Sequence, residues 1–98
     1  MNYIKAVKTI ELDTGIDLSG MYMIEILWWN PARGKGSFTA TYKASDVSVA
    51  TYTTTVTDIE MAGDWLFQVK YTDYDLDVGY TDEITIEFRK NLEEDAIS

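Results

Sequence analysis

The sequence predicts an all-β domain, a β-sandwich of about seven antiparallel strands, and three observations lead to this prediction. Short segments of alternating apolar and polar residues recur along the chain, and turn residues separate them about every 8 to 12 residues. The apolar residues are rich in aromatic and β-branched types, which fit a pleated, half-buried surface. The length of 98 residues suits one domain with one core, which we expect over residues 1–89, followed by a polar tail over residues 90–98.

The composition excludes several classes of function. Seventeen acidic residues against 8 basic ones give a net charge of −9, which repels phosphate groups, so we expect no nucleic acid as a partner. No apolar run is long enough to span a membrane, and we expect no membrane partner. The chain lacks His and Cys, the usual proton carrier at neutral pH and the strongest side-chain nucleophile. A carboxylate pair remains open for glycoside hydrolysis, but we expect a protein that is not an enzyme and binds no cofactor.

The first half of the chain carries three predicted strands. The first is expected over residues 3–12, where apolar residues keep to even-numbered positions and two lysines suit a sheet edge. The second, over residues 21–29, contains one charge, Glu25, and is the best candidate for a central strand. A loop with one Pro and two Gly, residues 30–36, leads to a third strand over residues 38–43.

The second half begins with two short predicted strands, over residues 47–49 and 52–56. A capping-box motif of the form Thr-x-x-Glu follows them and predicts one short helical turn near residues 58–62. The last strand is expected over residues 83–88, after an acidic loop over residues 73–79.

The segment MAGDWLFQVKY, residues 61–71, predicts a central strand and the kind of sandwich it belongs to. Its alternate residues share one face: Trp65, Phe67, Val69 and Tyr71. In immunoglobulin-like domains the corresponding strand reads Asp-x-Gly-x-Tyr-x-Cys. Gly63, Trp65 and Phe67 stand at the Gly, Tyr and Cys positions of that pattern, and Met61 stands at the Asp position. We therefore expect an immunoglobulin-like β-sandwich.

Trp28 and Trp29 are adjacent on a predicted strand, so their side chains point to opposite faces and one of them is expected outside the core. Three roles remain open for an exposed Trp29. It can anchor a protein interface, or stack on a sugar ring with a nearby tyrosine, the candidates being Tyr22, Tyr74 and Tyr80. It can also pack under the loop of residues 31–36 of its own chain.

Three further groups of residues are candidates for a protein interface. Arg33 and Lys35 form a basic loop on an acidic molecule. That loop can meet an acidic loop of an adjacent subunit, made by Asp73, Asp75 and Asp77, although solvated charge is the more common explanation for such loops. Leu92 lies in the tail, which either frays or adds to the sheet edge of a neighbour.

The same acidic loop partly matches a calcium-binding loop, because carboxylates at alternate positions can converge on a hard cation. The EF-hand pattern fails at its sixth and twelfth positions, which are Val78 and Ile84 here. A different calcium site that joins Asp73, Asp75, Asp77 and Asp82 stays open, beside the alternative of a solvated hairpin loop.

Three motifs carry a resemblance to a known family: Asp17-Leu18-Ser19-Gly20, Tyr52-Thr53-Thr54 and Ala62-Gly63-Asp64-Trp65. They are similar to motifs of small immunoglobulin-like proteins among the virion structural proteins of tailed bacteriophages, over roughly residues 9–88. The hairpin Pro31-Ala32-Arg33-Gly34 departs from the Pro-x-Gly of that family by one extra residue. The matching positions are corner and core residues, so no functional residue is carried over.

The resemblance implies a virion component of the tail, baseplate, neck or capsid, assembled in the bacterial host cytoplasm. Its partners would be other virion proteins, in a symmetric assembly of several copies. The alternative is a carbohydrate-binding module for a host surface glycan, assisted by calcium. Fold analogy does not distinguish between the virion locations.

Overall fold

A computed structural model of the chain describes residues 2–91, which form an all-β domain without any helix. The strands pair antiparallel with one another. They are β1 (Thr9–Asp13), β2 (Met21–Trp29), β3 (Lys35–Lys43), β4 (Asp46–Thr53), β5 (Gly63–Asp73), β6 (Val78–Tyr80) and β7 (Ile84–Phe88).

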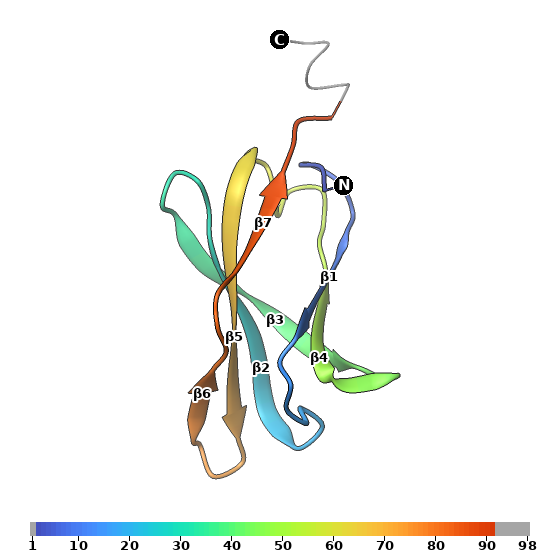
Figure 1. Cartoon of the computed structure of the whole chain (residues 1–98), viewed down its shortest axis with the longest axis vertical. Helices are drawn as coiled ribbons and strands as arrows, with labels where there is room; N and C mark the ends of the chain where they lie inside the picture. The colour runs from blue at the N-terminus through green and yellow to red at the C-terminus, as the bar shows by residue number, and fades with distance from the viewer. Residues whose placement is uncertain (1, 92–98) are drawn as a thin grey trace.

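The strands form one curled sheet in the order β1-β4-β3-β2-β5-β6, and β7 also pairs with β5. The strand β3 belongs to both halves of this sheet. Its first part pairs with β2, from Trp29↔Lys35 to Ile24↔Ala40, and its last part pairs with β4, from Thr41↔Thr51 onward. Figure 1 shows β3 crossing between the half that holds β2 and β5 and the half that holds β1 and β4. The two halves therefore face each other, as in a sandwich-like domain.

The core lies between the two halves and is built by alternate residues of the strands. On β5, Trp65, Phe67 and Val69 are buried, as the alternation in the sequence predicts. The other strands contribute the inward residues Ile10, Leu12, Ile24, Ile26, Phe38, Ala40, Ala50 and Phe88. Burial of one such large side chain stabilises the fold by about 1.5–3 kcal/mol.

The start of β5 is fixed by a side-chain hydrogen bond. The Nε1–H of Trp65 donates to the carbonyl oxygen of Met61, four residues earlier, over 2.9 Å. Between them Gly63 has φ of 127°, a conformation that residues with a side chain rarely adopt. A methyl group at Gly63 would also lie 2.7 Å from Cγ of Pro31 in the β2–β3 hairpin. This glycine is therefore required by both backbone conformation and packing.

Two other glycines make room for aromatic rings of the neighbouring strand. Trp28 is paired with Gly36 on β3, and a methyl group at Gly36 would lie 2.5 Å from the indole of Trp28. Tyr71 is paired with Gly79 on β6 in the same manner, with 2.3 Å to the Tyr71 ring. Each aromatic ring therefore packs over the glycine of the neighbouring strand. The Nε1–H of Trp28 is buried and has no hydrogen-bond partner.

The helical turn predicted near residues 58–62 is wrong. The carboxylate of Asp58 accepts hydrogen bonds from the Thr55 amide and the Tyr52 hydroxyl, each over 2.8 Å, so it closes a turn on the residues before it. Burial acts to raise the pKa of this carboxyl, but these hydrogen bonds outweigh it and hold the pKa below its ordinary value. After the turn, the carbonyl of the buried Ile59 accepts a hydrogen bond from the distant Lys5 amide over 2.7 Å, a contact outside any local helical turn.

Most of the predicted strands need correction at their boundaries, and the third begins at Lys35 and not at residue 38. The first strand begins only at Thr9, and before it Tyr3 makes a single bridge to Arg89. The strands predicted over residues 47–49 and 52–56 are one strand, β4, which ends at Thr53. The last strand is preceded by β6, and residues 81–83 bulge opposite two residues of β5.

Replacement of Gly63 by Ala is expected to lower the free energy of unfolding by about 1–3 kcal/mol, because φ of 127° strains any side chain. Gly20→Ala is the matched control, since a methyl group there meets nothing within 4 Å, and we expect a change within about 0.5 kcal/mol. Urea denaturation of the two variants measures both values. Equal stability of the two variants would contradict the positive φ described for Gly63.

Candidate protein-interaction surfaces

The hairpin between β2 and β3, residues 30–34, is called the basic hairpin. It contains Arg33, and Lys35 follows it at the start of β3. The Oδ1 atom of Asn30 accepts hydrogen bonds from the amides of Ala32 (3.0 Å) and Gly34 (2.8 Å). The backbone of Asn30 also bonds to Gly34 and to Arg33, and Arg33 has φ of 66°. This is a type I turn followed by a left-handed residue. The exposed Arg33 therefore sits at the tip of a well-braced loop.

Beside the basic hairpin, the outer face of the β3-β2-β5 sheet carries a groove of about 410 Å³, called the sheet-face groove. Its apolar floor is formed by Leu27, Trp29 and Leu66, and Trp29 is 49 % exposed. Trp29 pairs across the strands with both Lys35 and Leu66, so the basic side chain lies next to the indole. The polar side chains at the groove are those of Lys35, Ser37, Gln68 and Glu83.

The hairpin between β5 and β6, residues 73–77, is called the acidic hairpin and repeats the geometry of the basic one. The Oδ1 atom of Asp73 accepts hydrogen bonds from the amides of Asp75 (2.9 Å) and Asp77 (3.0 Å). The Asp73 backbone bonds to Asp77 and Leu76, and Leu76 has φ of 67°. The two hairpins therefore share one backbone arrangement. An Asn side chain accepts the loop amides in the basic hairpin, and an Asp side chain accepts them in the acidic hairpin.

The two hairpins lie at opposite ends of the molecule. The strand β2 pairs with β5 from Trp29↔Leu66, beside the basic hairpin, to Met21↔Asp73, where the acidic hairpin begins. Figure 1 shows the β2–β3 loop at the upper end of the long axis and the β5–β6 loop at the lower end. The structure therefore brings Trp29, Arg33 and Lys35 together, and it separates them from the acidic residues.

The acidic hairpin also exposes aromatic and apolar side chains. Tyr22 and Tyr74 contact each other edge to face with ring centroids 5.7 Å apart, and both are more than half exposed. These rings lie at the far end of β2 from Trp29, and Tyr80 pairs with Lys70, opposite the middle of β2, so the register places none of the three tyrosines next to Trp29. The exposed indole also shows that the loop of residues 31–36 does not cover Trp29.

The calcium site that the sequence left open is not preformed in the part of the chain that the structure describes. No group of three or more acidic side chains converges there in a way that could hold a metal ion. The physical reason is local, because the Oδ1 atom of Asp73 binds two amides of its own loop. Asp82 follows β6, outside that loop.

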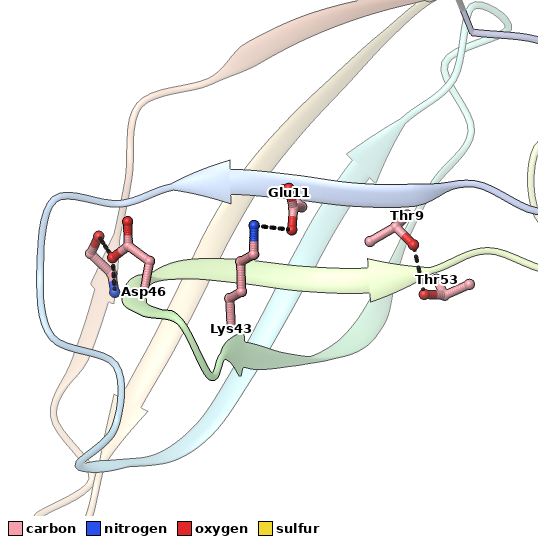
Figure 2. Close-up of polar contacts among 6 residues, drawn as sticks. Thr9, Glu11, Lys43, Asp46 and Thr53 are labelled. Carbon is pink, nitrogen blue, oxygen red and sulfur yellow. Dashed lines mark hydrogen bonds and ion pairs between the residues drawn. The ribbon is translucent and has the colours of Figure 1, made fainter.

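The outer face of the other half of the sheet is polar. Figure 2 shows Lys43 of β3 reaching across β4 to Glu11 of β1, with Nζ and Oε2 3.0 Å apart. The hydroxyls of Thr9 and Thr53 lie 3.0 Å apart on the same face. Large apolar side chains are therefore gathered on the face with the sheet-face groove and not on this one.

The sequence predicted Trp29 as a contact residue but missed Leu27 and Leu66, which complete the groove floor. Leu66 falls on the strand face that also carries Asp64 and Gln68, which was a usable signal, but only the register Trp29↔Leu66 brings it next to Trp29 and Leu27. Leu92 lies outside the described residues. No helix among residues 2–91 is long and apolar enough to cross a membrane. Comparisons with protein families, with curated proteins and with solved structures find no match to this chain.

Asp73→Ala is expected to reduce the free energy of unfolding by about 1 kcal/mol, because two amides of the acidic hairpin lose their acceptor. Asp73→Asn keeps a carbonyl oxygen at that position and is expected to stay close to the wild type. Thermal or urea unfolding compares the two variants. A loss of equal size in both would mean that charge, and not the loop hydrogen bonds, matters at this position.

Proposed function

We propose that this chain is an immunoglobulin-like, non-enzymatic assembly or decoration module of a bacteriophage particle. Its place is the tail, baseplate, neck or capsid, and its partners are other virion proteins. Several copies are arranged symmetrically in the virion, which is assembled in the cytoplasm of the bacterial host. The module acts by adhesion between complementary surfaces.

The strand pairing supports the immunoglobulin-like part of this proposal. In such domains strands B, E and D share one sheet and strands C, F and G share the other. The strands β1, β4 and the end of β3 pair as B, E and D would, and β2, β5 and β6–β7 pair as C, F and G would. Trp65 bonds back to Met61, in the way that the tyrosine of the tyrosine corner bonds to the preceding backbone.

The observation that carries the adhesion proposal is the half-exposed Trp29 on the apolar floor of the sheet-face groove, next to Lys35. Interfaces are enriched in tryptophan and arginine, and their strongest contacts centre on an aromatic anchor in an apolar patch with a polar rim. Arg33 at the tip of the basic hairpin extends this surface. The resemblance of the corner and strand motifs to phage virion proteins supplies the biological setting.

The two hairpins support an assembly of several copies. They have the same backbone geometry, lie at opposite ends of the domain and carry opposite charges. A contact between the basic hairpin of one copy and the acidic hairpin of the next is heterologous, so it can repeat into a ring or a filament. It also reduces the repulsion that a net charge of −9 creates between copies.

A second candidate function is binding of a host surface glycan in the sheet-face groove. Trp29 offers a ring for stacking, and Gln68, Lys35 and Glu83 offer polar groups at the rim. Isothermal titration with host cell-wall glycans, with and without a chelator, tests this candidate. Saturable binding that disappears in Trp29→Ala would favour it over the assembly function.

The assembly function predicts that peptides of this chain occur in purified phage particles from cultures that express its gene with the rest of the phage genome. We expect Trp29→Ala to lower incorporation at least about tenfold, because an anchor tryptophan accounts for about 2 kcal/mol or more. Quantitative mass spectrometry of gradient-purified particles measures the copy number.

Tyr42→Ala serves as the control, since this tyrosine is 41 % exposed and lies on β3 away from the groove. Its incorporation is expected to match the wild type. A chain that is abundant in the lysate and absent from the particles would contradict the proposed function.

A further inference from the structure

Among residues 2–91, the strand β1 pairs only with β4 and so forms a free edge of the described sheet. Within this antiparallel pair, the Thr54 amide donates to Lys8, and the Thr14 amide donates to Ser48, each over 2.8 Å. The even-numbered residues of β1 are therefore the ones that bond to β4, and the odd-numbered ones point the other way. The N–H and C=O groups of Thr9, Glu11 and Asp13 are thus directed away from the sheet.

The free edge of β1 borders a cleft on the open side of the domain. This cleft has a volume of about 320 Å³ and lies between Leu12 to Thr14 on one side and Tyr71, residues 80–82 and Ile84 on the other. Ile84 is 38 % exposed there, although its neighbours Ile86 and Phe88 on the same face of β7 are better covered. The lining of the cleft is therefore mixed, with the apolar side chain of Ile84 and two tyrosine rings beside polar and acidic side chains.

The rim of this open side is acidic. Glu11 and Asp13 stand on the outer face of β1, and Asp82 lines the cleft from the opposite edge. Lys43 is the one basic side chain that the structure shows bonded to this group, through Glu11. The free edge thus combines outward-directed backbone groups, a cleft with a partly apolar lining and a negative outer side.

A second copy of this chain does not suit the free edge. Antiparallel pairing of β1 with another β1 would set the acidic residues of the two strands opposite or diagonal to each other, which is destabilising. The net charge of −9 on each copy adds to this repulsion. The negative charge of the edge therefore favours a strand that carries positive charge.

We propose that the free edge of β1 binds an extended segment of a different protein, in which apolar and basic residues alternate. The segment would pair with the outward N–H and C=O groups of Thr9, Glu11 and Asp13 as an added strand. Because side chains alternate between faces, its apolar residues would enter the cleft beside Leu12 and Ile84, and its basic residues would meet Glu11 and Asp13. This site is separate from the sheet-face groove and does not depend on the proposed function.

The test uses a capped eight-residue peptide in which Lys and Val alternate, called the Lys peptide. The matched control, called the Glu peptide, has Glu in place of each Lys. In titrations followed by amide NMR, the Lys peptide is expected to bind saturably and to shift resonances of residues 9–13 and 80–84. The Glu peptide is expected not to bind. The acidic peptide of residues 92–98 is also expected not to bind, and binding of that peptide would make another copy of the chain the partner.

Glu11→Pro tests the backbone pairing, since it removes an amide that points away from β4 and so leaves the β1–β4 ladder intact. We expect at least a tenfold loss of affinity for the Lys peptide. Glu11→Gln loses the charge but keeps the amide, and is expected to lose less affinity than Glu11→Pro.

If Glu11→Pro lowers stability, a Lys peptide with N-methyl groups on alternate residues replaces it, because such a peptide cannot pair along one edge. Failure of the Lys peptide to bind, equal binding of the Lys and Glu peptides, or undiminished binding in both the proline variant and the methylated peptide would overturn the proposal. Trp29→Ala is expected to leave peptide binding unchanged, so this proposal and the assembly function fail independently.

Discussion

The burial of alternate residues on β5 is the constraint on which the rest of the structure depends. Trp65 contacts Trp28, with ring centroids 5.4 Å apart, and it also contacts Phe88 at 6.1 Å, so it joins β2, β5 and β7 on the inner side. Its hydrogen bond to Met61 fixes where the strand begins. A shift of β5 by one residue would exchange its faces, bringing Leu66 and Gln68 inward and taking Trp65 out of the core.

The same constraint determines which surfaces are available for contacts. With Trp28 turned inward, Trp29 must face outward, and the register with β5 places Leu66 next to it. The outer face of the other half of the sheet is polar, with threonines and the Glu11–Lys43 ion pair. The two loops with hydrogen-bonded Asn30 and Asp73 then hold opposite charges at the two ends of the same pair of strands. The proposed adhesion would therefore require no rearrangement of the fold.

Local sequence patterns predicted much of this structure, because the alternation of side chains along a strand and the preferences of turn residues depend on only a few neighbouring positions. The bounds of β2 and the inward residues of β5 agree with the sequence analysis. The helical turn near residues 58–62 was wrong, since the Ile59 carbonyl bonds to the distant Lys5 amide, a contact that no local motif encodes. The groove floor was missed for the same reason, because it arises from pairing between strands that are far apart in sequence. The edge position of the first strand was expected from its lysines, but the residues that form the edge follow only from the register with β4.

The most direct test of the inward and outward assignment is hydrogen exchange of the three indole N–H groups, followed by NMR after transfer to D₂O. The Trp65 indole is buried and bonded to Met61, so it is expected to exchange slowest, and the half-exposed Trp29 indole is expected to exchange first. Trp29→Phe assigns the fast resonance. A Trp65 indole that exchanges as fast as that of Trp29 would contradict the register of β5 and the account built on it.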